Sequence, residues 1–276
     1  MASAPQSSTN AVSPAVSEDP RGKMLCFSNL VMTYSWVLIT MGIALSFKQA
    51  RSNQTPYGRY AEKLGSRRFV PAKLAWFLQE LPSFLLPVLL VRSSGGKQGI
   101  GRMLLLCFFC GHYFHRTFVY SMLTKGRPLP LRIVVFALIF CSLNGLVQGH
   151  YLLHCTVYSD AWLSDVRLAA GVVLFLVGMA INIHSDYILR NLRKPGEFTY
   201  KIPKGGMFEY VSCANFFGEI VEWFGFAVAS WSLPAFSFAF FTLCIIGPRA
   251  YNHHRFYHEK FADYPQSRKA VIPFIF

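Results

Sequence analysis

The sequence predicts an all-α membrane protein that crosses the bilayer seven times. Hydrophobic residues make up 53% of the chain, charged residues only 14%, and the mean hydropathy is +0.34. A soluble domain of 276 residues is less apolar than this. The chain also divides into apolar runs of about 20 residues, the length that crosses a hydrocarbon layer of ~30 Å. These observations together predict a polytopic helical bundle.

The apolar runs predict where the helices lie. The runs cover residues 24–47, 72–91, 101–124, 131–155, 166–190, 207–232 and 234–258. Little more than Leu233 and Pro234 separates the last two runs, and they form one domain over residues 24–276 with the others. Residues 1–23 are rich in Ser, Pro and Ala without a helical or strand period, which predicts a disordered tail.

Charge predicts the orientation of the bundle. The formal net charge is +14, and the basic residues gather in alternate connections between the runs. These connections hold Lys48, Arg51, Arg59, Lys63, Arg67, Arg68, Lys125, Arg127, Arg132, Arg190, Arg193, Lys194, Lys201, Lys204, Arg255, Lys260, Arg268 and Lys269, whereas the others hold chiefly Arg92, Lys97 and Arg102. Because short basic loops stay in the cytosol, we expect a cytosolic C-terminus and a lumenal N-terminus. Basic residues divided in this way form no continuous face for nucleic acid.

Two further segments take their expected place from this orientation. The sequon that begins at Asn53 falls in a loop assigned to the cytosol, so we expect it to carry no glycan. Residues 264–276 combine aromatic side chains with cations, which predicts a tail lying at the membrane interface.

Cysteine and histidine spacings predict neither a metal site nor a disulfide framework. The seven cysteines are scattered, and most lie within apolar runs. Cys107 and Cys110 form a CxxC in an apolar run without a second pair, which favours packing over redox chemistry or zinc. His253 and His254 are adjacent, so they point to different sides of a helix and are poorly placed to bind one metal ion.

Polar side chains inside the second and third runs indicate a functional chamber. An ionisable group at the bilayer centre costs about 2.5–3.5 kcal/mol, so such groups usually face a cavity. Glu80 is expected roughly 12 Å deep at 1.5 Å per residue, and Tyr113 lies near the middle of its run. An acid and a phenol at similar depth can hold one carbonyl oxygen in an apolar chamber. The alternative is that Glu80 only pairs with His115 or Arg116.

The last three runs carry polar stripes at four-residue spacing, which places each stripe on one helix face. The stripes are Asn182 and Asp186, then Asn215 and Glu219, then Arg249, His253 and Tyr257. The expected topology puts all three at the cytosolic side, where Arg and Lys residues suit a phosphate-bearing cofactor. Gly205 and Gly206 precede the sixth run, where backbone N–H groups at a helix start can bind a pyrophosphate. The alternative is a set of interhelical hydrogen bonds that only hold the bundle together.

Several strings in these runs resemble a known family. They are Trp-Phe-Leu-Gln-Glu-Leu-Pro-Ser-Phe at 76–84, His-Tyr-Phe-His-Arg-Thr-Phe-Val-Tyr at 112–120, Asn-Ile-His-Ser-Asp-Tyr-Ile-Leu-Arg at 182–190, Arg-Lys-Pro-Gly at 193–196 and His-His-Arg-Phe-Tyr at 253–257. In this order they resemble the vertebrate steroid 5α-reductases, from about residue 55 to the end of the chain. The strings of the second and third runs look more like the type 2 enzymes and the 190–196 string more like type 1, so the resemblance leans to type 2.

The resemblance implies a multi-pass enzyme of the endoplasmic reticulum membrane that uses NADPH to reduce the Δ4 double bond of 3-oxo-Δ4 steroids such as testosterone or progesterone. It implies a steroid chamber mainly within residues 24–155 and an NADPH pocket mainly within 166–276. By position, Glu80 and Tyr113 match the residues at the steroid 3-oxo group. The positions that match the cofactor site are Asn182, Asp186, Arg193, Tyr200, Asn215, Glu219, Arg249, His253 and Tyr257.

Two positions depart from the type 2 pattern. Thr124 stands in place of Asn and Phe136 in place of Arg, so these contacts are absent or are replaced by Arg127 or Arg132. Two other functional classes remain open at this point: a membrane methyltransferase that uses S-adenosylmethionine, and a sterol-binding transporter or receptor without catalysis. The sequence gives no signal for the oligomeric state.

Overall fold

The computed structural model describes residues 12–14, 26–51, 68–95, 98–194, 197 and 199–276, and almost all of its regular structure is helical. The helices are α1 (Ser28–Arg51), α2 (Ala72–Ser93), α3 (Ile100–Phe114), α4 (Ser121–Leu123), α5 (Leu131–His150), α6 (Val166–Asn191), α7 (Ala214–Ser230) and α8 (Leu233–Lys260). A π-helix, His115–Tyr120, joins α3 to α4, and a second, Tyr151–Cys155, extends α5. Short 3-10 helices cover Asp160–Ser164 and Gly206–Glu209.

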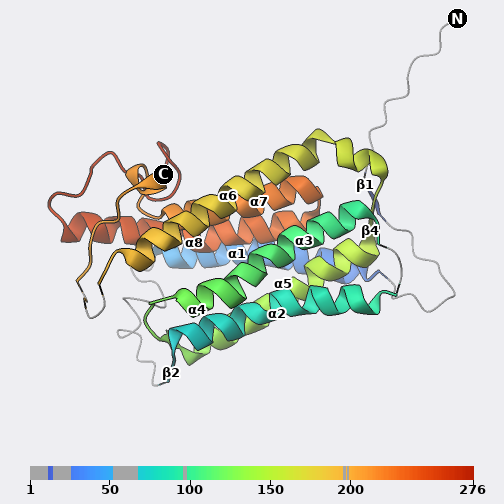
Figure 1. Ribbon diagram of the computed structural model, residues 1–276, viewed down its shortest axis with the longest axis horizontal. Coiled ribbons are helices and arrows are strands. Elements are labelled where there is room, and N and C mark those ends of the chain that lie inside the picture. The colour runs from blue at the N-terminus through green and yellow to red at the C-terminus, as the bar shows by residue number, and fades with distance from the viewer. Residues whose placement is uncertain (1–11, 15–25, 52–67, 96–97, 195–196, 198) are drawn as a thin grey trace, which may run out of the picture.

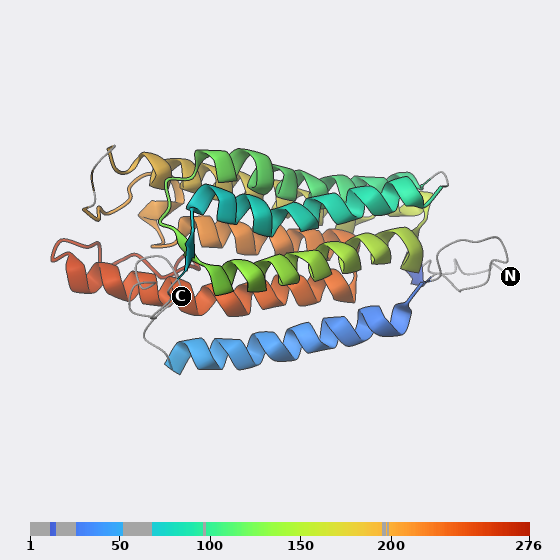
Figure 2. The same ribbon diagram turned by 90° about the horizontal axis from the view of Figure 1, so that it is seen from below.

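The long helices lie side by side in one bundle and alternate in direction (Figure 1). As a result, the loops gather at two ends of the bundle. The segments after α4, α6 and α8 lie at one end with the C-terminus, whereas α1 begins at the opposite end. Figure 2 shows α1 on the outside of the bundle against α8, so the first and last long helices are neighbours.

Five of the described helical segments are long and apolar enough to cross a membrane: α1, α2, the extended α5 (Leu131–Cys155), α6 and α8. The third and sixth predicted runs are also helical. Within them, the segment from α3 to α4 is interrupted by the π-helix, and α7 has only 17 residues, which include Glu219 and Glu222. The all-α membrane class is therefore confirmed, while the seven crossings and the orientation stay predictions.

Two short antiparallel strand pairs lie at the ends of the bundle. Strand β2 (Phe69–Val70) pairs with β3 (Leu129–Pro130), and β1 (Val12–Pro14) pairs with β4 (Thr156–Tyr158). Strand β1 falls inside the predicted disordered tail, so that prediction is wrong for these three residues. The partner strand supplies backbone hydrogen bonds from a distant part of the chain, which no local period can indicate. The rest of residues 1–23 and the sequon at Asn53 lie outside the described residues.

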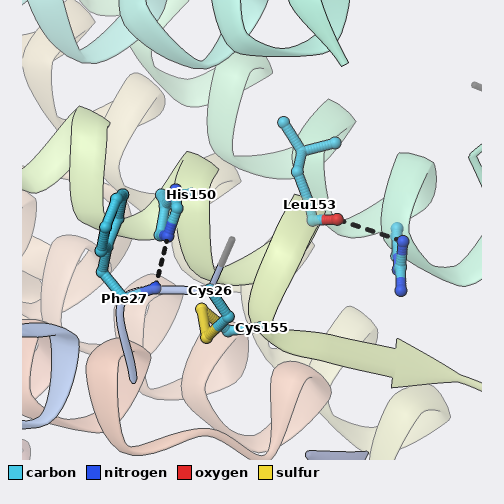
Figure 3. Close-up of a disulfide and its surroundings, with 6 residues drawn as sticks. Cys26, Phe27, His150, Leu153 and Cys155 are labelled. Carbon is cyan, nitrogen blue, oxygen red and sulfur yellow. Dashed lines mark hydrogen bonds between the residues drawn. A yellow bond between two sulfur atoms is a disulfide. The ribbon is translucent and has the colours of Figure 1, made fainter. Parts of the chain in front are cut away.

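A disulfide joins Cys26 to Cys155, which corrects the expectation that no disulfide forms (Figure 3). The two cysteines are 129 residues apart, so their spacing carried no signal. They meet because α1 begins, and the π-helix after α5 ends, at the same end of the bundle. Beside the bridge, the backbone N–H of Phe27 donates to Nε2 of His150 at 3.2 Å. Among the described residues, Cys107 and Cys110 are free thiols.

Helices α6 and α7 pack backbone against backbone. Gly171 and Gly178 on α6 face Gly225 and Gly218 on α7, and in each helix the two glycines are seven residues apart. A Cβ atom added at Gly178 would lie 2.6 Å from Cα of Glu222, and one added at Gly218 would lie 2.7 Å from the carbonyl oxygen of Gly178. Real side chains do not fit at such distances, and small residues of this kind are the usual means of close helix approach in membranes.

Helices α2 and α5 form a second close pair with glycines on one side only. A Cβ atom at Gly145 of α5 would lie 2.8 Å from Cα of Ser83, and one at Gly149 would lie 3.1 Å from Cα of Pro87. The core between the two pairs is aromatic, with Phe109, Trp223 and Phe226 all 1% exposed or less. The bundle therefore holds two rigid helix pairs with α3 between them, and the candidate site lies among these helices.

Candidate functional site

Arg116, inside the bundle, contacts side chains of the second, third and fifth predicted runs and lies near a carboxylate of the sixth. The guanidinium of Arg116, on the π-helix after α3, donates to Oδ2 of Asp186 on α6 at 3.3 Å. It also lies 4.8 Å from the ring centre of Trp76 and 4.1 Å from that of Tyr120. Both members of the ion pair are buried, and Glu219 of α7 is within electrostatic range of both. Stacking on aromatic faces holds the guanidinium plane in place.

The polar stripes predicted on α6 and α7 face each other. The side-chain amide of Asn215 donates to Oδ1 of Asp186 at 3.3 Å, and that of Asn182 donates to the backbone oxygen of Asn215 at 2.9 Å. The close approach of α6 to α7 at their glycines makes these short side-chain contacts possible. Asn182, Asp186 and Asn215 thus belong to one hydrogen-bonded network, with Glu219 within electrostatic range of Asp186. The network also fastens the two helices, as the structural alternative expected.

Glu80 and Tyr113 approach the same face of α5. Asn144 Nδ2 donates to the Tyr113 phenol oxygen at 3.3 Å, and Cys141 Sγ lies 3.9 Å from Oε2 of Glu80. Residues 141 and 144 are one helical turn apart, so the acid and the phenol are neighbours. The other contact of the Glu80 carboxyl is the amide of Gln79 at 3.5 Å. Both contacts of Glu80 are long for hydrogen bonds, although its side chain is buried.

The alternative partner of Glu80 has a different role in the structure. Arg116 makes its hydrogen-bonded ion pair with Asp186, and no hydrogen bond joins it to Glu80 among the described contacts, although Glu80 is within electrostatic range of the guanidinium. The sequence did not indicate this pairing, because it depends on which helices are neighbours. The π-helix at His115–Tyr120 was also missed; it begins two residues after Tyr113 and carries Arg116. Such local widening of a helix is common at functional sites.

The remaining residues expected at the cofactor site surround the end of the bundle that holds the C-terminus. Arg193 lies 5.5 Å from the ring centre of Tyr200, whose ring is edge-on to Phe256 at 5.3 Å. Arg249 Nε donates to Oε1 of Gln49 at 3.3 Å, which ties α8 to α1. His253 and Tyr257 each have an aromatic neighbour. The ring centre of His253 lies 6.1 Å from that of Phe216, and the ring of Tyr257 is stacked on that of Tyr264 with their centres 5.3 Å apart.

The glycine pair before α7 does not form the expected helix start. Gly205 and Gly206 have positive φ angles of 92° and 54°, and α7 begins only at Ala214. The N–H of Gly205 donates to Oε1 of Glu209 at 2.5 Å, so a side chain of this protein already occupies it. This hydrogen bond, and Arg268 nearby, lower the pKa of Glu209. The expectation of a pyrophosphate site at these N–H groups is therefore wrong for Gly205.

The C-terminal segment is packed against this end of the bundle, whereas the sequence predicted a tail. Its place at the membrane interface stays a prediction. The N–H groups of Ser212 and Cys213 donate to the carbonyl oxygens of Lys269 and Ala270 at 2.8 and 3.1 Å. Arg268 is 2% exposed and donates to the carbonyl oxygen of Pro203 at 2.9 Å. The backbone pairing explains the difference, because a segment that supplies partners to the chain before α7 cannot lie free on the membrane.

The two positions that depart from the type 2 pattern have different surroundings, because Thr124 lies inside the bundle and Phe136 lies on its outside. Thr124 is buried, and its Oγ1 accepts from the N–H of Gly126 at 3.2 Å. Phe136 is 72% exposed on the outer face of α5, and Arg132 is also exposed. Position 136 therefore adds no cation to the interior, and Arg132 does not replace one there.

A buried hydrogen-bonded pair that the sequence did not single out links α3 to α7. Nδ1 of His112 lies 2.6 Å from Oε1 of Glu222, and the two residues are 4% and 0% exposed. His112 directly precedes Tyr113, and Glu222 follows Glu219 by three residues. Within the described part of the chain, no group of three or more His, Cys, Asp or Glu side chains is placed to hold a metal ion.

Comparison with known proteins places the chain in a family. Residues 127–276 match the family model described as 3-oxo-5-alpha-steroid 4-dehydrogenase. The chain is 54% identical to 3-oxo-5-alpha-steroid 4-dehydrogenase 2 of Sus scrofa over 254 residues, which is 91% of this chain and 98% of the relative. It is 53% identical to the human type 2 protein over 253 residues, with the same coverage.

Type 1 relatives also match, and the Bos taurus protein is 52% identical over 226 residues. The human 3-oxo-5-alpha-steroid 4-dehydrogenase 1 is 47% identical over 251 residues, which is 90% of this chain and 96% of the relative. The resemblance to the type 1 and type 2 group, with its lean to type 2, is therefore confirmed. This chain belongs to the 3-oxo-5-alpha-steroid 4-dehydrogenase family.

Proposed function

We propose that this chain is an NADPH-dependent oxidoreductase of the endoplasmic reticulum membrane. It reduces the Δ4 double bond of 3-oxo-Δ4 steroids, of the testosterone and progesterone type, to 5α-3-oxosteroids. The activity in the names of its relatives supports the reaction class. The structural observation that carries the proposal is the placement of Glu80 and Tyr113 against one face of α5, inside the apolar bundle.

The reaction explains why an acid and a phenol are needed together. Addition of hydride at C5 moves the electron pair of the double bond through the enone onto the 3-oxygen, and C4 then takes a proton as the carbonyl re-forms. Donors fixed at the 3-oxygen therefore stabilise the transition state more than the ground state. The Tyr113 oxygen accepts from Asn144, which fixes the phenol for donation through its own O–H. Glu80 donates in its protonated form, and its long contacts within the protein suit a group completed by substrate.

The residues of the other half fit a phosphate-bearing dinucleotide. NADPH, when bound, supplies the hydride. Arg193 and Arg249 are the cations we assign to its phosphates, because guanidinium groups form charge-assisted hydrogen bonds with phosphate oxygens. Asn182, Asp186, Asn215 and Glu219 offer the amides and carboxylates that hydroxyl and carboxamide groups require. Tyr200, His253 and Tyr257 provide aromatic and polar surface at the same end of the bundle.

The proposed location and topology also have physical support. The disulfide lies at the end where α1 begins, and disulfides persist in oxidising compartments such as the lumen of the endoplasmic reticulum. The opposite end holds most of the basic residues of the loops, as expected for the cytosolic side. Seven crossings with a lumenal N-terminus fit both features. A glycan found on Asn53 would overturn this orientation.

A direct assay tests the function. Membranes that contain the protein are incubated with testosterone and NADPH, and the 5α-reduced product is measured by mass spectrometry, with NADH in a parallel reaction and Tyr113→Phe as the control protein. We expect 5α-dihydrotestosterone with NADPH and little with the variant. Binding of S-adenosylmethionine without binding of NADPH would instead favour a methyltransferase. Steroid binding without NADPH oxidation would favour a transporter or receptor.

A further inference from the structure

The buried pair His112–Glu222 lies between the two halves of the proposed site. His112 lies in the last turn of α3, directly before Tyr113, and Glu222 lies on α7, three residues beyond Glu219. The two side chains meet at 2.6 Å between Nδ1 and Oε1 in the aromatic core, where the imidazole is edge-on to Trp223 at 4.5 Å. The pair is therefore a polar link through an otherwise apolar contact of α3 with α7.

Stability alone gives a poor account of this pair. Glu222 is 0% exposed, and its second oxygen, Oε2, has no hydrogen-bond partner among the residues that the structure describes. Apolar side chains of similar volume often stabilise a protein as well as a buried polar pair of this kind, because taking the polar groups out of water is costly. A half-satisfied carboxylate in a dry core calls for a role in function or in helix register.

The backbone under Glu222 is fixed in place. Helix α6 crosses α7 at this point so closely that a Cβ atom on Gly178 would lie 2.6 Å from Cα of Glu222. One turn further along α6 is Asn182, and the next turn brings Asp186, both members of the network with Asn215. The position of Glu222 is thus set by the same helix pair that carries the proposed cofactor residues.

The other end of the link reaches the proposed steroid residue. His112 precedes Tyr113 in the chain, and the Tyr113 ring lies 5.8 Å from that of Trp223 at an interplanar angle of 35°. The dipeptide His112–Tyr113 therefore packs on the dipeptide Glu222–Trp223. The hydrogen bond of Asn144 to the Tyr113 phenol and the Arg116–Asp186 ion pair are the neighbouring directional contacts, and His112–Glu222 is the one that joins α3 directly to α7 at this level. The apolar contacts around it are not directional.

We propose that His112 and Glu222 are a positioning pair, which fixes the Tyr113 phenol relative to α6 and α7 and so aligns the steroid with the cofactor. This inference rests on the proposed reductase function and deepens it. The pair touches neither the 3-oxygen nor the hydride, so it acts through Tyr113. Small errors of alignment between reacting atoms are costly: a displacement of about 1 Å can reduce turnover by about 100-fold.

The test compares Glu222→Gln, Glu222→Leu and the double variant His112→Leu/Glu222→Leu in the full-length protein. Glutamine keeps an oxygen that accepts from His112, whereas leucine removes it at similar volume. We expect Glu222→Leu to lower kcat by about 100-fold, with the Kd for NADPH changed far less, and Glu222→Gln to restore most of the turnover. The double variant should regain thermal stability, because no unpaired polar group remains, but should keep the low kcat.

A double-mutant cycle tests whether the His112–Glu222 pair acts through Tyr113. Glu222→Leu introduced into Tyr113→Phe should cause much less further loss than in the wild type, because the group that the pair positions is already gone. Tyr158→Phe serves as the control, since it removes a buried hydrogen bond to the carbonyl oxygen of Ser230 at the far end of α7. It should leave kcat near the wild-type value.

Each outcome decides the inference separately from the function. If the wild type reduces steroid and the losses of kcat simply follow the losses of melting temperature across all variants, the pair is structural and the inference is overturned. Native turnover in His112→Leu/Glu222→Leu, or fully additive losses with Tyr113→Phe, overturns it as well. A wild type without steroid reduction sinks the proposed function itself, whatever the variants do.

Discussion

The helix pairs α6–α7 and α2–α5 solve the same packing problem in different ways. In α6–α7 the glycines are reciprocal, two on each helix, and the backbones touch at two levels. In α2–α5 the glycines lie on α5 alone, opposite Ser83 and Pro87 of a helix with two internal prolines. The first pair carries the proposed cofactor residues Asn182, Asp186, Asn215 and Glu219, and the second carries Glu80 and Asn144, the α5 partner of Tyr113.

The difference suggests a division of labour. A helix pair fixed by reciprocal glycines holds its side chains at constant separation, as a site for a cofactor of constant shape requires. Proline inside a helix removes a hydrogen bond and crowds the preceding turn, and α2 has Pro82 two residues after Glu80. We therefore expect side-chain chemistry to matter most on the steroid side, and charge and backbone fit to matter most on the cofactor side.

The largest expected effect is on the steroid side. Tyr113→Phe should lower kcat by about 100- to 1,000-fold with the fold intact, because one donor to the developing charge on the 3-oxygen is lost. Glu80→Gln should keep more activity than Glu80→Ala, since an amide still donates. Steady-state kinetics with testosterone, together with circular dichroism of the purified variants, measures both. Wild-type turnover in Tyr113→Phe would remove the phenol from the mechanism.

The next effect is on the cofactor side and concerns charge. Arg193→Ala or Arg249→Ala should weaken NADPH binding by about 1.5–3 kcal/mol, because each removes a charge-assisted hydrogen bond. NADPH titration followed by its fluorescence gives the Kd. Arg167→Ala is the matched control, because Arg167 pairs with Asp165 at the opposite end of the bundle. Unchanged affinity in both arginine variants would mean that this end binds another ligand.

Substitution of the contact glycines should affect the helix pairs α6–α7 and α2–α5 differently. Gly178→Val should destabilise the protein by about 1–3 kcal/mol, because a side chain there overlaps α7. Gly145→Val should destabilise it through α2. We expect the first to raise the Kd for NADPH and the second to raise the KM for steroid, as measured by melting curves and kinetics in detergent. Gly111→Val is the control, since a Cβ atom at Gly111 meets nothing within 4 Å. A higher KM for steroid in Gly178→Val and a higher Kd for NADPH in Gly145→Val would contradict this assignment of the two helix pairs.

The smallest effect is the pH dependence of the segment before α7. The pKa of Glu209 is lowered in the folded protein, chiefly because the N–H of Gly205 donates to the carboxylate. The carboxylate therefore stabilises the fold at pH values above its ordinary pKa of 4.5, and this stabilisation is lost as the pH falls below that value. The melting temperature of the wild type should therefore fall more steeply from neutral pH to pH ~4 than that of Glu209→Gln. Parallel curves would show that this carboxylate adds nothing measurable.

Local pattern predicted the helices well and their neighbours poorly. The apolar run at 166–190 corresponds to α6 (Val166–Asn191) and that at 72–91 to α2 (Ala72–Ser93), because hydrophobic length is a property of each segment alone. Four-residue spacing likewise identified the facing stripes of α6 and α7. By contrast, the partner of Arg116, the bridge from Cys26 to Cys155 and the fold of the C-terminal segment all depend on which distant segments meet.

The candidate residues divide in the same way. Asp186 and Asn215 were found as members of stripes, and the structure joins them by a hydrogen bond. His112 belongs to one of the strings that resemble the family, but Glu222 follows Glu219 by three residues and falls outside the four-residue spacing of the predicted stripe. The roles of Glu80 and Tyr113, and those of the cofactor residues, stay predictions until the variants are measured.

The contact of α1 with α8 has a consequence for biosynthesis. The ribosome releases α1 first and α8 last, so the first helix to enter the membrane cannot complete its packing until synthesis is nearly over. Cys155 emerges much earlier, once α5 and its extension have been made. From then on, a disulfide between Cys26 and Cys155 can hold α1 close to the helices already made. When α8 is synthesised, α1 is then already beside the bundle on which both helices pack.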